Sequence, residues 1–251
     1  MNATIAPAGR KGLLGPAAAA LAAFAVLIGL GVWQLERKVW KENLIDAIGR
    51  RLAAAPVDLP RASDWPKLGR GEWEFRHVRV AGTFRHEQEA LVYTSGSTLR
   101  PDVRGAGYWV FTPAQTSDGP VPVDRGFVPL ERRDVATRAI GQVSGSLDIV
   151  GALRWPDARS WFTPNDDPQK NIWFVRDPIA IAGGKSWGAV PPFYVEQEAP
   201  VPPGGLPAPG TLTPNLPNNH LQYAITWFGL AAVLAGVFAV FAWGRYREGR
   251  A

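Results

Sequence analysis

The sequence contains no cysteine, and its single methionine is the initiator Met1. Copper chaperones, thiol oxidoreductases, iron–sulfur proteins and most structural zinc sites take their ligands or nucleophiles from Cys or Met. These classes are therefore excluded. A disulfide framework is excluded as well, so cysteine usage leaves the redox state of the compartment open.

Motifs of the common enzyme classes are also missing. No G-x-G-x-x-G or phosphate-binding loop stands between a predicted strand and a helix, and "TSGST" at residues 94–98 lacks the G-x-S-x-G elbow. Asp166 and Asp167 are adjacent in a Pro-bounded loop, where side chains of an extended chain point to opposite faces. The net charge of +5 comes without a recognition-helix, zinc or stacking signature. We expect neither an enzyme nor a nucleic-acid-binding protein.

Charged residues are absent from two long stretches, 12–35 and 221–244. At about 1.5 Å per residue, each can cross a hydrocarbon core of about 30 Å. For the first stretch the alternative is a cleaved signal peptide, because Arg10 and Lys11 form a basic n-region and residues 29–31 are small. Its length and its continuation into the amphipathic "WQLERKVWKENLIDAIGRRL" favour a transmembrane helix. The sequence thus predicts one such helix at each end.

Basic residues flank the outer ends of both spans: Arg10, Lys11, Arg245, Arg247 and Arg250. The positive-inside rule then places both termini in the cytoplasm and the central segment outside. A basic cluster at residues 37–41 lies on the other side of the first span. The rule gives less weight to long connecting segments, so the assignment is kept.

The segment between the spans changes character at Glu72. From there short extended runs alternate with Gly and Pro: "WEFRHVRVAGTF", "EALVYTS", "GYWVFTPA", "PVPVDRGFV", "SLDIVGALR", "NIWFVRD" and "PFYVEQE". This spacing predicts an antiparallel β domain, either a barrel or a sandwich. His77 falls inside a run and His86 in a turn, and we expect both to be structural or exposed.

The predicted organisation has seven parts. They are a cytoplasmic tail (1–11), a first transmembrane helix (12–35), a juxtamembrane helix with a Pro-containing loop (36–71), a periplasmic β-rich domain (72–198), a Pro/Gly-rich tether (199–220), a second transmembrane helix (221–244) and a second cytoplasmic tail (245–251). The tether is expected to be extended, because its Pro and Gly content disfavours a helix or a paired strand.

The motifs also occur in a characteristic order. A first span ending in "GVWQLERKVWKENLI" is followed by "VRVAGTF", "YWVFTPA", "PVDRGFVP", "GALRWPD", "FTPNDDPQKNIWFVRDP" and "NNHLQYAITWFGLA". This order, between two terminal spans, resembles the Surfeit locus protein 1 family of cytochrome c oxidase assembly factors. There are two departures: Asp124 stands where the family usually has Asn, and residues 187–215 match nothing in the family pattern.

The resemblance implies a protein that performs no turnover chemistry. It would assist the insertion of haem a into the catalytic subunit of a haem-copper oxidase, by transient binding of haem or of the subunit. The implied partners are that subunit, membrane lipid and, as a further option, haem a synthase. The composition and the short tail without a transit peptide favour a bacterial inner membrane. The alternatives are a haem-independent scaffold for oxidase subunits and an accessory protein unrelated to oxidases.

Bacterial members of the family resemble haem a binders with a ligand histidine at the second span, and His220 holds that position here. His220, Tyr223 and Trp227 are spaced to share one helix face, and Arg37 or Lys41 could meet a propionate. Haem needs an axial ligand, an apolar pocket and cations near its carboxylates. His220 would bind metal only through haem iron. Alternatively, His220 is hydrated or forms part of a helix cap with the two preceding asparagines, and the aromatics serve the membrane interface.

Overall fold

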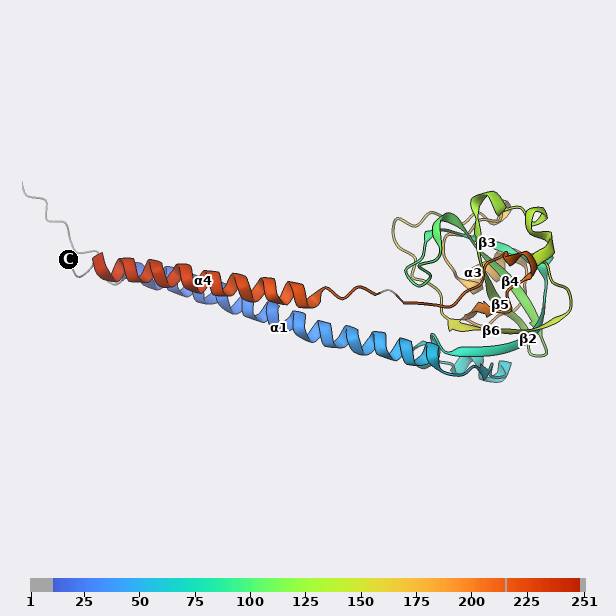
Figure 1. Ribbon diagram of the computed structural model, residues 1–251, viewed down its shortest axis with the longest axis horizontal. Helices are drawn as coiled ribbons and strands as arrows, with labels where there is room; N and C mark the ends of the chain where they lie inside the picture. The colour runs from blue at the N-terminus through green and yellow to red at the C-terminus, as the bar shows by residue number, and fades with distance from the viewer. Residues whose placement is uncertain (1–10, 215, 249–251) are drawn as a thin grey trace, which may run out of the picture. The chain divides into compact units, whose positions relative to one another are not determined.

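The computed structural model describes residues 11–214 and 216–248. Its contacts divide the chain into two compact units. One comprises the first helix up to Asp46 together with the chain from Pro217 onwards, and the other runs from Ala47 to Leu216. Figure 1 labels the elements of both units.

Two long helices form the first unit. Helix α1 (Lys11–Ala53) and helix α4 (His220–Glu248) lie alongside one another in opposite directions (Figure 1). Both are long and apolar enough to cross a membrane. Helix α1 continues without a break into its charged half, as the sequence predicts, and ends shortly before Pro56, where a helix rarely continues.

The second unit is built on seven strands. They are β1 (Val57–Asp58), β2 (His77–Phe84), β3 (Ala90–Gly96), β4 (Arg104–Thr116), β5 (Gly119–Pro129), β6 (Ser146–Arg154) and β7 (Tyr194–Ala199). Every predicted run except "NIWFVRD" contains a strand. That run forms only isolated bridges, one of them between Val92 and Trp173, because a helix begins directly after it.

The strands close into a barrel. Neighbours follow the order β2–β6–β7–β5–β4, and a further pairing of β4 with β2 completes the circle, with β3 and β1 at its sides. The closing contact pairs Thr83 with Gln115 and Phe84 with Ala114. The predicted fold class, a β-rich barrel or sandwich between two apolar helices, is confirmed, and the closed order selects the barrel. One difference is that β5 pairs with β7 in parallel, because β7 returns to the sheet after a long connection.

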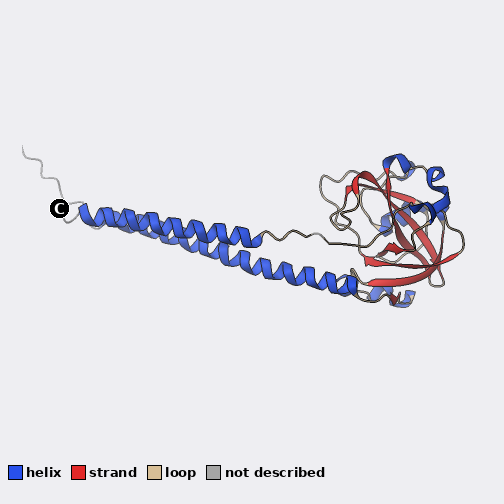
Figure 2. Cartoon of the chain, viewed as in Figure 1, coloured by secondary structure: helices blue, strands red, loops and turns tan. Residues whose placement is uncertain are grey.

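Short helical segments connect the strands around the barrel (Figure 2). They are η1 (Ala62–Lys67), α2 (Arg70–Trp73), η2 (His86–Gln88), η3 (Leu130–Arg132), η4 (Val135–Gly141), η5 (Pro168–Lys170), α3 (Pro178–Lys185) and η6 (Pro203–Gly205). The side chain of Asp177 caps α3 by accepting from the backbone N–H groups of Ile179 and Ala180.

The barrel core follows from alternation along the strands. In β2, Val78, Val80 and Phe84 point inward while the residues between them are exposed or glycine. They pack with side chains of β5, β6 and β7 in one apolar cluster. A second cluster is mainly aromatic and includes Trp109 and Trp173. The barrel therefore has a core of its own.

The Pro/Gly-rich segment after β7 contains the short helix η6, where an extended chain was expected, and the domain holds much of the segment. Ala208 exchanges two backbone hydrogen bonds with Phe127, at 3.0 and 2.8 Å, and Thr213 N–H donates to the Leu99 carbonyl at 2.8 Å. Gly126 permits this approach, because its φ of +115° favours glycine and a Cβ there would overlap the Ala208 carbonyl. The part without such bonds is therefore shorter than the predicted tether.

Candidate functional site

The candidate site lies where α4 begins beside α1. Partly or fully buried residues of α1 recur at intervals of three and four: Ala17, Ala20, Phe24, Leu27, Gly31, Gln34, Lys38 and Lys41. A matching series on α4 comprises His220, Ala224, Trp227, Ala231, Leu234 and Phe238. This spacing is typical of two helices that pack along a continuous seam. His220 therefore faces α1.

Small side chains bring the two helices close together. At Gly31 a Cβ would overlap the ring of Phe228, and Ala224 and Ala231 are almost completely buried. Close approach through small residues is the usual way in which apolar helices associate in a membrane. The same approach brings polar side chains at the start of α4 within hydrogen-bonding distance of α1.

The central contact of the site is between His220 and Gln34. The Nδ1 atom of His220 lies 2.7 Å from the Oε1 atom of Gln34, and the Gln34 residue is only 9% exposed. Among the residues that the structure describes, no side chain or carbonyl is hydrogen-bonded to His220 Nε2. One ring nitrogen is therefore bound within the helix pair, and the other remains for a ligand.

Two further bonds join the helices at this level. The Asn218 amide donates to the Lys38 carbonyl at 3.4 Å, and the Lys41 ammonium donates to the Pro217 carbonyl at 2.6 Å. Asn218 Oδ1 also accepts from the His220 N–H at 3.5 Å, consistent with the cap that the sequence suggests. These contacts fix the chain just before His220.

The other predicted site residues are placed around this contact. Trp227 is half-buried in the seam, whereas Tyr223 is 54% exposed. Arg37 is exposed, and its guanidinium stacks 4.0 Å from the centroid of the Trp40 ring. The structure thus brings His220 to Gln34, a residue that the sequence analysis did not single out. Gln34 could have been found as the one amide side chain in the uncharged stretch 12–35.

The two remaining histidines have structural roles. His77 Nδ1 lies 3.2 Å from the Ala54 carbonyl and its Nε2 lies 3.0 Å from Glu198, whose carboxylate raises the pKa of His77. His86 Nε2 lies 2.8 Å from the Val143 carbonyl, and burial lowers the pKa of His86. Within the described ranges, no group of three His, Asp or Glu side chains could hold a metal ion.

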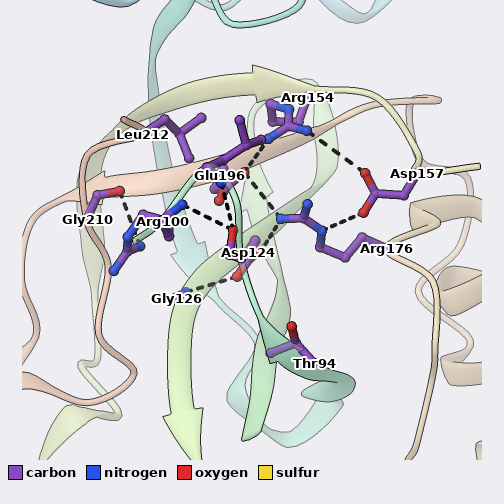
Figure 3. Close-up of polar contacts among 12 residues, drawn as sticks. Thr94, Arg100, Asp124, Gly126, Arg154, Asp157, Arg176, Glu196, Gly210 and Leu212 are labelled. Atoms are coloured by element: carbon purple, nitrogen blue, oxygen red, sulfur yellow. Dashed lines mark hydrogen bonds and ion pairs between the residues drawn. The ribbon is translucent and has the colours of Figure 1, made fainter. Parts of the chain in front are cut away.

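A second cluster, of charged side chains (Figure 3), lies on the face of β5, β6 and β7 opposite to the apolar cluster that contains Val123, Leu153 and Val195. Arg154 Nη1 donates to Glu196 at 2.8 Å, and Arg176 Nε donates to Asp157 at 2.8 Å. Arg176 Nη1 lies 3.4 Å from Glu196 and 3.8 Å from Asp124. The cluster thus connects β5, β6 and β7 with the loops that follow β6.

Burial governs the protonation of this cluster. Asp124 is fully buried, and this desolvation together with the nearby Glu196 carboxylate raises the pKa of Asp124 to about 7, against the opposing effect of Arg176. A cavity of about 390 Å³ borders the cluster, lined by Tyr93, Thr94, Trp109, Arg154 and Arg176 among others. Both guanidinium groups already face carboxylates, so an anionic ligand would compete with Glu196 and Asp157. We interpret the cluster as a structural connection between the strands and the loops that follow β6.

Comparison with known proteins gives consistent results along most of the chain. The model of the SURF1 family matches residues 21–232. Surfeit locus protein 1 from Homo sapiens is 38% identical over 218 residues, covering 81% of this chain and 70% of the relative. The SURF1-like protein of Monosiga brevicollis is 34% identical over 216 residues, with 83% and 80% covered. The matched range includes both Gln34 and His220.

Proposed function

Since this chain belongs to the SURF1 family, we propose that it is an assembly factor for a haem-copper cytochrome c oxidase and holds haem a transiently at His220. Family membership supports the role in oxidase assembly. The two apolar helices support membrane anchoring. The proposed location is a bacterial inner membrane. Both termini are placed in the cytoplasm and the β domain in the periplasm, because basic residues flank the outer ends of the spans.

The observation that carries the haem proposal is the environment of His220. Its Nδ1 atom is bound to Gln34 inside the helix pair, which leaves Nε2 as a nitrogen ligand, and the half-buried Trp227 follows two turns further along the same face of α4. When bound, haem a would supply the iron that takes this nitrogen. A histidine ligand whose second nitrogen is hydrogen-bonded is the usual arrangement at metal sites. The residues present would therefore hold haem iron through one histidine nitrogen.

The cationic groups near the site differ in what they can contribute. Lys41 already donates to the Pro217 carbonyl at 2.6 Å, whereas Arg37 is exposed and stacked on Trp40. Arg37 is thus the better of the two for a propionate carboxylate. A single histidine and one aromatic wall hold the cofactor less tightly than a closed pocket would. This suits a protein that passes haem to the catalytic subunit of the oxidase and catalyses no reaction itself.

The first test is an absorption spectrum of the purified full chain in detergent, after co-expression with haem a synthesis. We expect a haem a band in the wild type and its loss in His220→Ala. Gln222→Ala, an exposed neighbour on the same helix turn, is the matched control and should keep the band. Equal haem in the wild type and His220→Ala would assign the ligand to another residue.

A second candidate function is a haem-independent scaffold, and an exposed turn favours it. Trp161 is 95% exposed and Phe162 is 72% exposed, at the centre of a turn in which Thr163 N–H donates to the Ser160 carbonyl at 3.1 Å. Large aromatic side chains without intramolecular cover are typical of protein contact sites. The partner would be the oxidase catalytic subunit.

Replacing Trp161 and Phe162 together by Ser tests the scaffold. Since neither side chain is buried, we expect thermal stability to change little and co-purification of the oxidase subunit to fall about tenfold or more. Ile140→Ser, at another exposed apolar residue, is the control. Unchanged co-purification in the double variant would remove this turn from the contact surface.

A further inference from the structure

A buried pair of polar side chains interrupts the apolar seam between α1 and α4. Gln34 is the one amide side chain in residues 12–35, and it lies at a seam position between Gly31 and Lys38. A buried amide without a partner is unfavourable by roughly 1–3 kcal/mol. At 2.7 Å, the bond to His220 is at the short end of the usual range and meets this requirement. The hydrogen bond to His220 therefore supplies the partner that the buried Gln34 amide requires.

The hydrogen bond has a consequence for the imidazole. A neutral histidine carries its proton on either Nδ1 or Nε2, and the partner of one nitrogen decides which. Oε1 of Gln34 can only accept, so the Nδ1 atom facing it carries the proton. The Nε2 atom then has a free lone pair. In water the neutral side chain favours the opposite tautomer, in which Nε2 is protonated and cannot bind a metal.

We propose that Gln34 is a positioning residue for His220. By accepting the Nδ1–H proton, it selects the tautomer with a basic Nε2 and fixes the orientation of the ring. The identity of the ligand on Nε2, haem iron, rests on the function proposed above. The tautomer itself does not depend on it, because the hydrogen bond forms within the protein.

The proposal distinguishes among substitutions at one position. Gln34→Leu has a similar volume but no acceptor, so it removes the bias on the tautomer. Gln34→Glu keeps an acceptor in the same place and strengthens it, so it should preserve the function. Gln222→Leu makes the same chemical change at an exposed position of α4 and serves as the control.

The first measurement uses the haem-free full chain in lipid nanodiscs. With ¹⁵N-labelled histidine only three side chains contribute, and His220→Ala identifies the signals of His220. At a pH that keeps the ring neutral, we expect protonated Nδ1 and unprotonated Nε2 in the wild type, Gln34→Glu and Gln222→Leu. In Gln34→Leu the populations should shift towards the Nε2–H tautomer. A protonated Nε2 in the wild type, or no change in Gln34→Leu, would overturn the proposal.

The second measurement is haem a affinity in the same set of variants. Loss of a hydrogen-bond partner of a histidine ligand typically weakens metal binding by about 10- to 100-fold. We expect this loss of affinity in Gln34→Leu. In Gln34→Glu we expect the affinity to be retained and the reduction potential of the haem to be lower, because a stronger hydrogen-bond acceptor at Nδ1 makes Nε2 of His220 a better electron donor to the iron. A packing defect alone would not change the potential in this direction.

The two measurements separate the two proposals. If His220→Ala binds haem a as tightly as the wild type, the function proposed for His220 fails, whatever the tautomer. If His220→Ala loses haem a but Gln34→Leu binds it normally, His220 remains the ligand and the role of Gln34 is disproved. If both variants weaken binding and Gln34→Glu restores it, both proposals are supported.

Discussion

At the scale of single residues, the most unusual feature is the buried carboxyl group of Asp124. It lies on β5 without solvent contact, 3.8 Å from Arg176, and it accepts the Gly126 N–H at 3.0 Å. An amide would keep the bond to Gly126 and would not place a second negative charge near Glu196. The carboxyl group therefore makes folding sensitive to pH at this site.

The sign of this sensitivity follows from the raised pKa of about 7. Between about pH 4 and 7 the unfolded chain releases the Asp124 proton while the folded protein keeps it, so this group lowers the free energy of unfolding as pH rises through that range. We therefore expect the difference in unfolding free energy between Asp124→Asn and the wild type to increase in favour of the variant, by a few kcal/mol, when the pH is raised from 5 to 8. Chemical denaturation at the two pH values measures it.

The control for this prediction is Asp118→Asn, which changes an exposed carboxyl group. Its stability difference from the wild type should be nearly the same at both pH values. Arg176 keeps Asp157 and Glu196 as partners in Asp124→Asn, so that variant does not leave a buried charge unpaired. A constant difference between Asp124→Asn and the wild type would contradict the raised pKa.

The residues of the candidate site were only partly predictable. His220 could be identified because it is one of three histidines and stands at the start of an apolar stretch. Its partner could not, because Gln34 is 186 positions away and a sequence alone does not set the register between two helices. The ion pairs around Arg176 were unpredictable for the same reason, since they join β5, β7 and the loop after β6, which are far apart in the sequence.

At the scale of elements, the junction of β5 with the Pro/Gly-rich segment can be tested through two glycines. Gly126 and Gly119 have nearly the same φ, +115° and +114°, yet only Gly126 faces a neighbour, the Ala208 carbonyl. Replacing Gly119 by Ala should cost about 1–3 kcal/mol of stability for the backbone conformation alone. Gly126→Ala should cost more, because Ala208 must also move.

Thermal unfolding of both variants gives this comparison. We expect the larger loss in Gly126→Ala, together with faster proteolysis of the segment that contains Ala208. Equal losses of stability in the two variants would show that the segment containing Ala208 moves away from the added methyl group without a free-energy cost. The contact with Phe127 would then contribute little to the fold.

The elements themselves were largely predictable. Alternating runs located the strands, and apolar length located both long helices, because these patterns are local in the sequence. Two features escaped: the parallel pairing of β5 with β7 and the hydrogen bonds of the Pro/Gly-rich segment. Both depend on contacts between distant parts of the chain. The Pro and Gly content of residues 199–220 did not indicate that this segment forms backbone hydrogen bonds with Phe127 and Leu99.

At the scale of the whole molecule, the division into two units predicts that the β domain folds by itself. The barrel closes on its own strands and has its own core, and the last turns of α1 pack within the same unit, where Arg51 donates to carbonyls of Gly71 and Glu74. A fragment of residues 47–214 should unfold cooperatively in buffer without detergent. Because it lacks Gln34 and His220, it should not bind haem a.

Calorimetry and a haem titration of the fragment check these two expectations. Without a cooperative transition, the domain would depend on the long helices for its stability. Haem a binding at wild-type affinity would place the ligand in the β domain and contradict the role of His220. The full chain measured in parallel in detergent is the reference.

The narrow closure of the barrel has a consequence for how its interior meets water. Strands β2 and β4 share two residue pairs, whereas β2 and β6 share seven. Separation of β2 from β4 breaks fewer backbone hydrogen bonds than separation of β2 from β6, so native-state fluctuations should open the β2–β4 contact before the β2–β6 pairing. The peptide protons of Phe84 and its neighbours would then exchange with deuterium before those along β6.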